Sequence, residues 1–523
     1  MRLFAYAHEG FSGSLVTIEI DLRAGIPGTD IVGLPGAAIR EARERVRASI
    51  RNAGYLYPRE RVLVNLGPAD VPKTGSSFDL GIAFSILLSS GQLSKHRDAP
   101  DTVLVLGELG LDGLVRPVRG VIAAVLDAKD AGISEVVVAA RNAPEASAVS
   151  GVRVFPVEHL CDLERACMRS HYSRAEDADS DSDRDLHSQH TYPFRDVIGQ
   201  QRAKRAAFIA AVGGHHLLLA GPPGSGKTMI ARRLPALMPE LDDETASEVT
   251  RIYSLSGRLA DYEGLMRRAP FRSPHHTAGP AGIIGGGRSV SPGDISLAHG
   301  GILFLDEAPE FRPGILQALR EPLEDRLIRI ARAGRQYVFP AKIQLVLAAN
   351  LCPCGALGKG SGYCTCSIQE ISRYWKRIGG ALLDRIDLRV PLASSEWQGE
   401  DSFEHTASDH EEYTAHGVQL AQQRLASIRS EFAMNSESDT DSWMTRMSRT
   451  VSRDAQQCLM DARAHMHLSH RACSSILRVA LTIAAIEDAE SVESEHLLEA
   501  VQHRRMGEAE SIWQDWVRCV ESV

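Results

Sequence analysis

The octapeptide GPPGSGKT, at residues 221–228, constrains this chain more than any other feature. It follows the apolar run LLLA and precedes the helix-forming stretch MIARRL. A strand that turns through such a loop into a helix is a phosphate-binding loop, because its backbone N–H groups can face phosphate oxygens. We expect Lys227 to reach the β and γ oxygens and the Thr228 hydroxyl to ligate Mg²⁺. The predicted nucleotide-binding residues of the loop are Gly221, Pro222, Pro223, Gly224, Ser225, Gly226, Lys227 and Thr228.

Two further segments have the pattern of a buried strand, and each is followed by polar residues. In GGILFLDEAPEF, four apolar residues precede Asp306 and Glu307. We expect Asp306 to hold Mg²⁺ and Glu307 to polarise the attacking water, which indicates hydrolysis rather than nucleotide binding alone. Two acids at a strand end could instead serve only solubility. A third strand, IQLVLAAN, ends at Asn350, which we expect to orient the water or sense the γ-phosphate.

Two arginines farther along the chain are candidates for stabilising the transition state. Arg385 lies in GGALLDRIDLRV between Asp384 and Asp387. A guanidinium supplied in trans by a neighbouring subunit is worth roughly 10³- to 10⁵-fold in rate. The alternative is an ion pair between Arg385 and one of the flanking aspartates. Arg471, in LSHRACSSILRV, is a candidate to fold over the nucleotide from the same subunit.

Acidic stretches divide the chain into three bodies. The stretches at 171–192 and 396–414 hold few apolar side chains and predict linkers, because such segments cannot repay the entropy of folding. Region 1–170 alternates strand and helix signals, as does region 193–395, whereas 415–515 is typical of amphipathic helices. The expected fold class is therefore α/β with a helical C-terminal body.

Composition and charge limit the partners. The net charge of −9 argues against a uniformly basic nucleic-acid-binding surface and still allows a local basic groove. The sequence has no apolar run of the ~18 residues that a membrane span needs. The N-terminal MRLFAYAHEG lacks the layout of a signal peptide, so we expect a cytoplasmic protein. Nine cysteines in that compartment are not expected to form disulfides.

These motifs together carry a family resemblance. The phosphate-binding loop, FLDE, LAAN, LLDRIDL and the helical Arg471 resemble the AAA+ ATPases. FRSPHHT and GIIGGG, inserted before Asp306, narrow this to the magnesium-chelatase-like branch, and the order of the three bodies resembles the YifB/ComM family over nearly the whole chain. The resemblance implies a P-loop AAA+ core, an N-terminal Lon-protease-like (S5-like) domain and a C-terminal helical lid. It also implies a homohexamer in which Arg385 acts in trans.

The Lon-like resemblance raises the question of proteolysis. The segment KTGSSFD places Ser77 on the nucleophile position of the Lon pattern. That chemistry needs a lysine base, but GELGLDGLVRPVRGVI places Ile122 on the lysine position, and Lys73 and Lys129 fall elsewhere. An isoleucine accepts no proton, so the serine remains a weak nucleophile. We expect a proteolytically inactive docking or oligomer-shaping domain, with Ser77 and Asp79 at a helix start.

Cysteines and histidines form two further clusters. The segment CPCGALGKGSGYCTC has a C-x-C…C-x-C pattern whose four thiolates suit tetrahedral Zn²⁺, although a reduced, metal-free loop is the alternative. Adjacent His275 and His276, in SPHHT, are expected to point apart and to form a structural or substrate-facing loop rather than a metal site. The predicted zinc ligands are Cys352, Cys354, Cys364 and Cys366.

The segment RLIRIARAGRQYVF predicts a basic hairpin. Its arginines recur every three residues without an acid among them, so they can grip phosphates without reading bases. A solvated basic turn is the alternative. By resemblance, this hairpin projects into the central pore of a hexamer. The predicted DNA-binding residues are Arg326, Arg329, Arg332 and Arg335.

The resulting expectation is a Mg²⁺-dependent hexameric ATPase that translocates on single-stranded or branched DNA. It resembles the ComM-type helicases that promote branch migration during uptake and recombination of DNA. The alternatives are a chelatase-like motor that remodels a protein partner or inserts metal, and an ATP-dependent protease. The isoleucine at position 122 argues against the protease.

Overall fold

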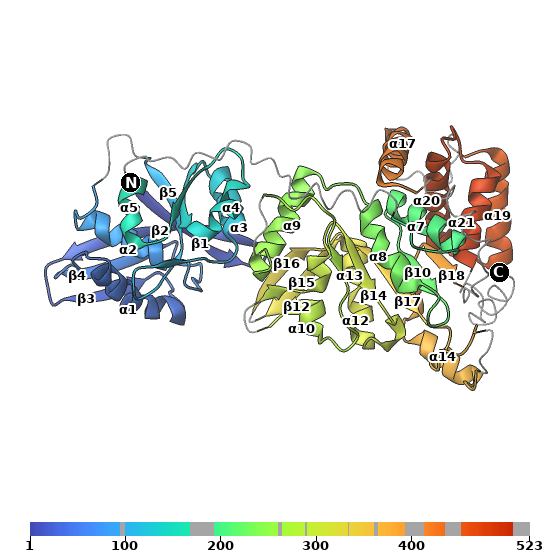
Figure 1. Cartoon of the computed structure of the whole chain (residues 1–523), viewed down its shortest axis with the longest axis horizontal. Helices are drawn as coiled ribbons and strands as arrows, with labels where there is room; N and C mark the ends of the chain where they lie inside the picture. Colours follow the sequence, from blue (N-terminus) through green and yellow to red (C-terminus); the bar gives the residue numbers. More distant parts are fainter. Residues whose placement is uncertain are drawn as a thin grey trace.

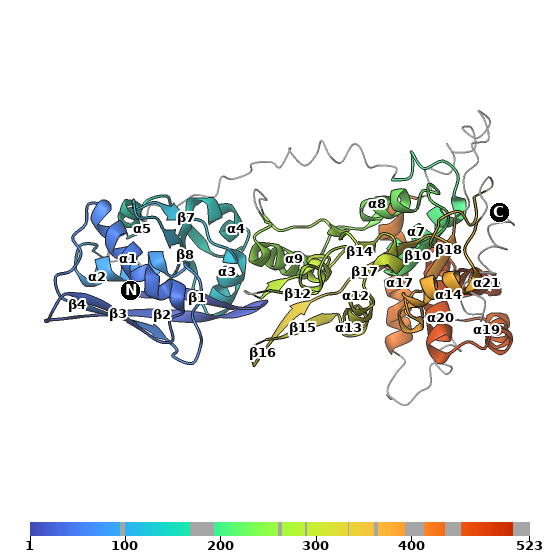
Figure 2. The same cartoon turned by 90° about the horizontal axis from the view of Figure 1, so that it is seen from below.

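The computed structural model describes residues 1–94, 100–167, 193–259, 264–287, 290–332, 334–359, 364–392, 413–434 and 451–505. The expected linker at 171–192 lies outside the described residues, as does that at 396–414 except for its last two residues. The described chain is elongated, with an N-terminal α/β body at one end, a second α/β body in the middle and helices at the far end (Figures 1 and 2). Among the described helices, none is both long and apolar enough to cross a bilayer.

A seven-stranded sheet forms the N-terminal body, in the order β3-β4-β2-β1-β5-β8-β9. Side chains alternate across it. In β5, Val103 and Val105 pack toward one apolar cluster with helices α1 and α2, while Leu104 and Leu106 pack toward the other with α3 and α4. The bounds are β1 (Arg2–Glu9), β2 (Ser12–Arg23), β3 (Gly28–Val32), β4 (Arg61–Gly67), β5 (Thr102–Leu106), β8 (Glu135–Ala139), β9 (Arg153–Val157), α1 (Ala37–Asn52), α2 (Asp79–Ser89), α3 (Val121–Asp130), α4 (Ala143–Ser147) and α5 (Leu163–Cys167), with a ribbon of β6 (Glu108–Leu109) and β7 (Val115–Arg116).

The middle body contains a five-stranded sheet in the order β11-β14-β17-β10-β18, and all of its neighbouring strands are parallel. Every residue of β10, β14 and β17 is buried, as expected for a parallel sheet covered on both faces. The carboxyl ends of these three strands therefore meet at one edge, where ligands bind in open α/β sheets. The strands are β10 (Leu217–Ala220), β11 (Phe271–Arg272), β14 (Ile302–Leu305), β17 (Gln344–Ala349) and β18 (Leu388–Pro391).

Helices and short ribbons surround this sheet. A two-stranded hairpin of β15 and β16 lies beside it, and a smaller ribbon joins β12 to β13. The helices of the middle body are α7 (Gln201–Gly213), α8 (Lys227–Leu237), α9 (Asp243–Ser256), α10 (Pro280–Ile283), α11 (Asp294–Leu297), α12 (Pro313–Ala318), α13 (Arg320–Asp325), α14 (Ile368–Lys376) and α15 (Gly380–Leu383). The ribbon strands are β12 (Gly285–Gly286), β13 (Ser291–Pro292), β15 (Leu327–Arg332) and β16 (Arg335–Pro340).

The C-terminal body is helical, as the sequence predicts. Helix α20 is its centre and packs on α17, α21 and α7. The apolar cluster of these helices is continuous with one face of the central sheet, because residues of β10, β14 and β18 belong to it. The hydroxyl of Ser469 caps α20 by accepting from the Ala472 N–H. The described helices are α17 (Ala415–Met434), α19 (Arg453–Met466), α20 (His470–Ile486) and α21 (Ser494–Arg505).

Among the described residues, the N-terminal body meets the middle body in two regions (Figures 1 and 2). In the first, α3 packs on α9. The guanidinium of Arg251 on α9 lies 3.2 Å from a carboxylate oxygen of Asp127 on α3, and 4.6 Å from the centre of the Phe11 ring. An ion pair and a cation–π contact from one side chain therefore fix this junction.

In the second contact, the β1–β2 turn reaches the basic hairpin. A guanidinium nitrogen of Arg335 lies 3.0 Å from Glu9 Oε1. Gly10, at φ +71°, passes so close to Tyr337 that an added Cβ would come within 3.2 Å of that ring. The N-terminal body thus touches the hairpin through both charge and close packing.

Candidate active site

The phosphate-binding loop connects β10 to α8, as the sequence predicts. Gly224 and Gly226 have φ of +86° and +88°, a left-handed conformation that favours glycine, and an added Cβ at either would meet nothing within 4 Å. The buried Ser225 hydroxyl has no hydrogen-bond partner among the described residues. An open glycine cradle with an unsatisfied buried hydroxyl fits the phosphates of a nucleotide.

Lys227 begins α8 and points back over the loop. Its ammonium donates to the carbonyls of Gly221 and Pro222, each at 2.8 Å. Burial lowers the pKa of Lys227 from 10.5 to about 8, against a smaller opposing effect of Asp306 and Glu307. The lysine is therefore held at the loop, where phosphate oxygens can replace the two carbonyls.

Thr228 and Asp306 meet across the edge of the sheet. The Thr228 hydroxyl donates to Asp306 Oδ2 at 2.8 Å, although 78 residues separate them in sequence. A hydroxyl and a carboxylate are oxygen ligands of the type that Mg²⁺ prefers, so the pair fits this ion.

Glu307 follows Asp306 in the left-handed conformation, at φ +52°. Its carboxylate lies 3.7 Å from Nδ1 of His276. The expectation that His275 and His276 point apart was wrong, since their ring centroids lie 4.2 Å apart and the rings are tilted by 33°. The contact with Glu307 was missed, because no spacing in the sequence relates residues 276 and 307.

Asn350 directly follows β17, the strand between β10 and β14. Parallel strands end at the same edge, so Asn350 lies between the phosphate-binding loop and the acids. This position agrees with the predicted role, which remains a prediction.

Arg385 and Arg471 converge on one carboxylate. Arg385, whose side chain is only 7% exposed, forms an ion pair with Glu324 of α13. Arg471 lies 3.0 Å from the same Glu324 oxygen and 3.9 Å from Asp384. Hydrogen bonds from Arg471 and then Arg385 lower the pKa of Glu324. The partner of Arg385 is therefore Glu324 rather than a flanking aspartate, and sequence reasoning missed it.

The basic hairpin forms as predicted, with β15 and β16 antiparallel and Arg332 opposite Arg335 at its tip. Two of its four arginines are paired with acids. Arg329 lies 2.9 Å from Glu321 and 2.7 Å from Asp325, and Arg335 pairs with Glu9. Arg326, at φ +59°, makes the turn from α13 into β15.

The turn around Ser77 lacks a base. Ile122, on the expected lysine position, is fully buried in α3. Lys73 donates to the Pro68 carbonyl, and among the described residues no lysine or histidine nitrogen hydrogen-bonds to the Ser77 hydroxyl. Asp79 lies in the first turn of α2 as expected, but it is buried and its carboxylate lies 2.9 Å from Arg45 Nε.

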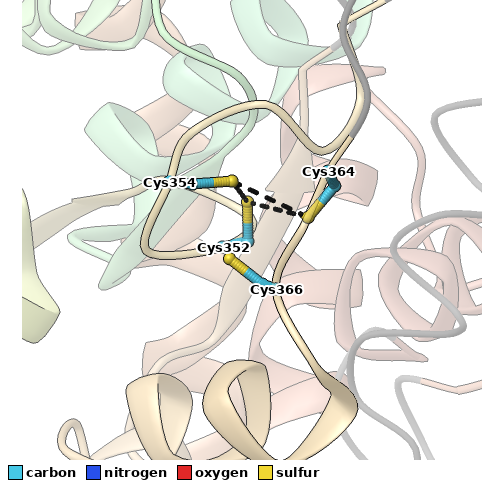
Figure 3. A group of neighbouring side chains, drawn as sticks. All are labelled: Cys352, Cys354, Cys364 and Cys366. Carbon is cyan, nitrogen blue, oxygen red and sulfur yellow. Dashed lines mark hydrogen bonds between the residues drawn. The ribbon is translucent and has the colours of Figure 1, made fainter.

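The four clustered cysteines come together between β17 and α14 (Figure 3). Their sulfur atoms all lie within 4.8 Å of one another. Cys352 is fully buried, Cys354 is exposed, and Cys364 and Cys366 are half-buried. The structure thus brings together the residues predicted to hold a metal.

The parallel sheet, the phosphate-binding loop, the two acids and the helical C-terminal body define a P-loop AAA+ protein. Family models agree along the chain: "Magnesium chelatase, subunit ChlI" matches residues 193–399, "Subunit ChlI of Mg-chelatase" matches 18–142, and "Magnesium chelatase, subunit ChlI C-terminal" matches 406–504.

Individual relatives narrow this class. The chain is 39% identical over 514 residues to competence protein ComM of Haemophilus influenzae, covering 96% of this chain and 97% of that protein. It is 37% identical over 509 residues to the uncharacterized protein YifB of Escherichia coli, covering 95% of each. An uncharacterized Mycobacterium tuberculosis protein is 45% identical over 397 residues, 75% of this chain and 76% of its own length. The chain belongs to the YifB/ComM family of magnesium-chelatase-like AAA+ proteins.

The N-terminal body has a separate similarity. Lon protease 2 of Bacillus subtilis is 29% identical over 141 residues, which is 26% of each chain. This match confirms the Lon-like character of the N-terminal body.

Proposed function

We propose that this protein is a Mg²⁺-dependent ATPase that assembles as a homohexamer and moves along DNA. The meeting of Thr228 with Asp306, beside Glu307, carries the ATPase part. The DNA part is supported by the basic hairpin and by the similarity to a protein named for competence. In its finer form, the proposal is a ComM-like helicase that promotes branch migration during DNA uptake and recombination.

In this proposal the phosphate-binding loop holds ATP, and Lys227 pairs with the β and γ oxygens. Thr228 and Asp306 hold Mg²⁺, which neutralises phosphate charge when bound. Glu307 takes a proton from the attacking water while Asn350 orients it. Arg471 acts on the nucleotide of its own subunit.

Arg385 acts on the nucleotide of the neighbouring subunit. For that role, its ion pair with Glu324 has to open, because the paired Arg385 side chain is only 7% exposed and needs to become accessible to a phosphate of another subunit. Glu324 is then the resting partner of both arginines, and its negative charge keeps the buried Arg385 compensated between cycles.

The hairpin arginines contact the DNA backbone in this proposal. Phosphates would replace the exposed acids around Arg329, a small cost because exposed ion pairs are worth about 0–1 kcal/mol. Contacts of this kind read no sequence and weaken with salt. Single-stranded or branched DNA is the proposed substrate, and the proposed place of action is the cytoplasm.

The cofactors of this activity are ATP and Mg²⁺. Zn²⁺ at the four cysteines takes part in no step of it and is a separate prediction.

A second candidate is a chelatase-like motor that remodels a protein partner. The pairing of Arg329 and Arg335 with acids of the same chain favours it, because two of the four proposed phosphate contacts are already neutralised. The magnesium-chelatase family matches are compatible with it as well. ATP-dependent proteolysis is disfavoured, since the position of its base is the buried Ile122.

Steady-state ATP hydrolysis with and without single-stranded DNA tests the proposal. We expect DNA to stimulate the wild-type protein, and the variant R329A/R332A to lose that stimulation while keeping its basal rate. The matched control is R23A/R61A, which removes two exposed arginines of the N-terminal body. Hydrolysis indifferent to DNA in all three proteins would overturn the DNA motor and favour the remodelling ATPase.

A further inference from the structure

The cysteine cluster has the dimensions of a metal site. The sulfur of Cys352 lies 3.3 Å from that of Cys354, and the sulfur of Cys364 lies 3.7 Å from Cys354 and 3.6 Å from Cys352. A tetrahedral ion with Zn–S bonds of about 2.3 Å holds its sulfurs about 3.8 Å apart. Disulfide sulfurs lie at about 2.05 Å, so these spacings fit ligands of one ion rather than disulfides.

The surrounding backbone also suits thiolate ligands. The N–H of Leu357 donates to the Cys352 sulfur at 3.4 Å, and that of Ala356 donates to Cys354 at 3.5 Å. Such N–H groups offset the negative charge that four thiolates leave around a divalent ion. The two pairs of ligands come from either side of a glycine-containing loop, which a shared ion would close (Figure 3).

The position of the loop connects it to the nucleotide site. It begins at Leu351, directly after Asn350, and the Leu351 carbonyl accepts a hydrogen bond from the Trp375 indole at 3.2 Å. At its turn, Gly355 packs on Pro223 of the phosphate-binding loop, where an added Cβ would lie 2.9 Å from the proline Cγ. The cysteine loop therefore adjoins the nucleotide site at both Asn350 and Pro223.

We propose that Cys352, Cys354, Cys364 and Cys366 bind one structural Zn²⁺, and that the zinc-closed loop supports the phosphate-binding loop through the contact of Gly355 with Pro223. Among the described residues of the cysteine loop, thiol contacts of Cys364 with Cys352 and Cys354 join the two halves, and such contacts are weak without the ion. The support behind Pro223 then loosens, and nucleotide affinity falls. The coupling rests on the proposed ATP site, whereas zinc binding does not.

Metal content of the purified full chain tests the first half. We expect close to one zinc per chain by elemental analysis, and loss of that zinc in C364S/C366S. The matched control is C458S, which removes a half-buried cysteine of α19 outside the cluster and should keep the zinc. A wild-type chain that holds no zinc, and takes up none when Zn²⁺ is added under reducing conditions, would overturn the proposal.

A zinc-retaining variant tests the coupling. In G355A, the added methyl group presses on Pro223 in a left-handed position at φ +72°. We expect this variant to keep its zinc and to bind a fluorescent ATP analogue about tenfold more weakly, as C364S/C366S should. The matched control is G132A, which has the same backbone strain at φ +82° but no neighbour within 4 Å, and should bind the analogue normally.

The outcomes separate this proposal from the proposed function. If the wild-type protein holds zinc but nucleotide affinity is unchanged in both G355A and the zinc-free C364S/C366S, the coupling is overturned and the ATPase proposal stays intact. Zinc-loaded wild-type protein that binds no nucleotide would instead overturn the proposed function. Thermal melting of each variant distinguishes a local effect from general unfolding.

Discussion

The phosphate-binding loop and the turn around Ser77 resemble each other in sequence, but only the loop meets the partner residues that its predicted chemistry needs. Each places small polar residues and glycine directly before a helix. At the first, residues from distant segments converge, and Thr228 of α8 bonds to Asp306 after β14. At the second, the residue that should act as base is Ile122, buried among apolar side chains. A reactive residue type therefore predicts chemistry only when the fold also brings its partners.

The two regions also differ in what their buried charges do. In the nucleotide site, Lys227 is held by backbone carbonyls that a ligand can replace. Near Ser77, the buried Asp79 is already paired with Arg45 of the same body. The buried charge of Lys227 is therefore available to a ligand, whereas the buried charge of Asp79 is already paired within the protein.

The largest predicted loss of activity comes from replacing Arg385, and it tests whether the nucleotide site needs a residue of a second subunit. If it completes the site of a neighbouring subunit, R385A should lower hydrolysis roughly 10³-fold or more. Mixing R385A with K227A subunits should then restore activity at roughly a quarter of the interfaces, because K227A still supplies the arginine. ATP hydrolysis of the mixture is the measurement. A mixture of K227A with E307Q, which repairs no interface, is the control, and no recovery in the first mixture would contradict a role in trans.

Glu307 should have the next largest effect. E307Q keeps the size of the side chain but cannot take a proton, so hydrolysis should fall about 10²- to 10⁴-fold while ATP binding persists. Single-turnover hydrolysis and nucleotide binding are measured on the same preparation. E310Q, which removes the exposed partner of Arg377, is the control. Equal losses of binding and hydrolysis in E307Q would argue against its role as base.

Introducing a lysine at position 122 would test the claim that the turn around Ser77 is not a catalytic site. I122K buries an ammonium in an apolar cluster and should destabilise the N-terminal body by about 3 kcal/mol or more. The denaturant midpoint measures this, with the conservative I122V as control. Neither wild type nor I122K is expected to react with a serine-directed fluorophosphonate. If the wild-type protein is labelled and S77A is not, Ser77 is reactive and the contrast between the two regions fails.

The smallest predicted effect is a loss of nucleotide affinity at high pH. Burial lowers the Lys227 pKa to about 8, so the lysine is charged below pH 8 and loses its proton above it. Phosphate favours the charged form, so binding takes up a proton above pH 8, and affinity should fall up to about tenfold per pH unit there. Nucleotide titrations from pH 7 to 9.5 test this. K227R, which stays charged, should show a flatter profile, and a flat wild-type profile would contradict the prediction.

The sequence was sufficient for features that local chemistry determines. The strand–loop–helix around Lys227, the acids after β14, the basic hairpin and the helical C-terminal body all follow from short patterns, and the structure contains each of them. The meeting of the four cysteines was also expected, since their close spacing leaves the chain little freedom to separate them.

Contacts between distant segments could not be predicted in this way. Glu324 lies in an ordinary charged helix, and only the fold brings it to Arg385 and Arg471. The close approach of the His275 and His276 rings, and that of His276 to Glu307, depend on the fold for the same reason. The packing of Gly355 on Pro223 depends on how β17 and β10 lie in the sheet, which their sequences do not encode individually.

The contact between the β1–β2 turn and the basic hairpin has a mechanical consequence. Glu9 holds Arg335, and Gly10 leaves no room between the turn and Tyr337. A hairpin anchored near its tip cannot swing as an isolated lever. In the proposed motor, a stroke of the hairpin would either break this anchor or move the N-terminal body with it, so the viscous drag on that body would limit the stroke.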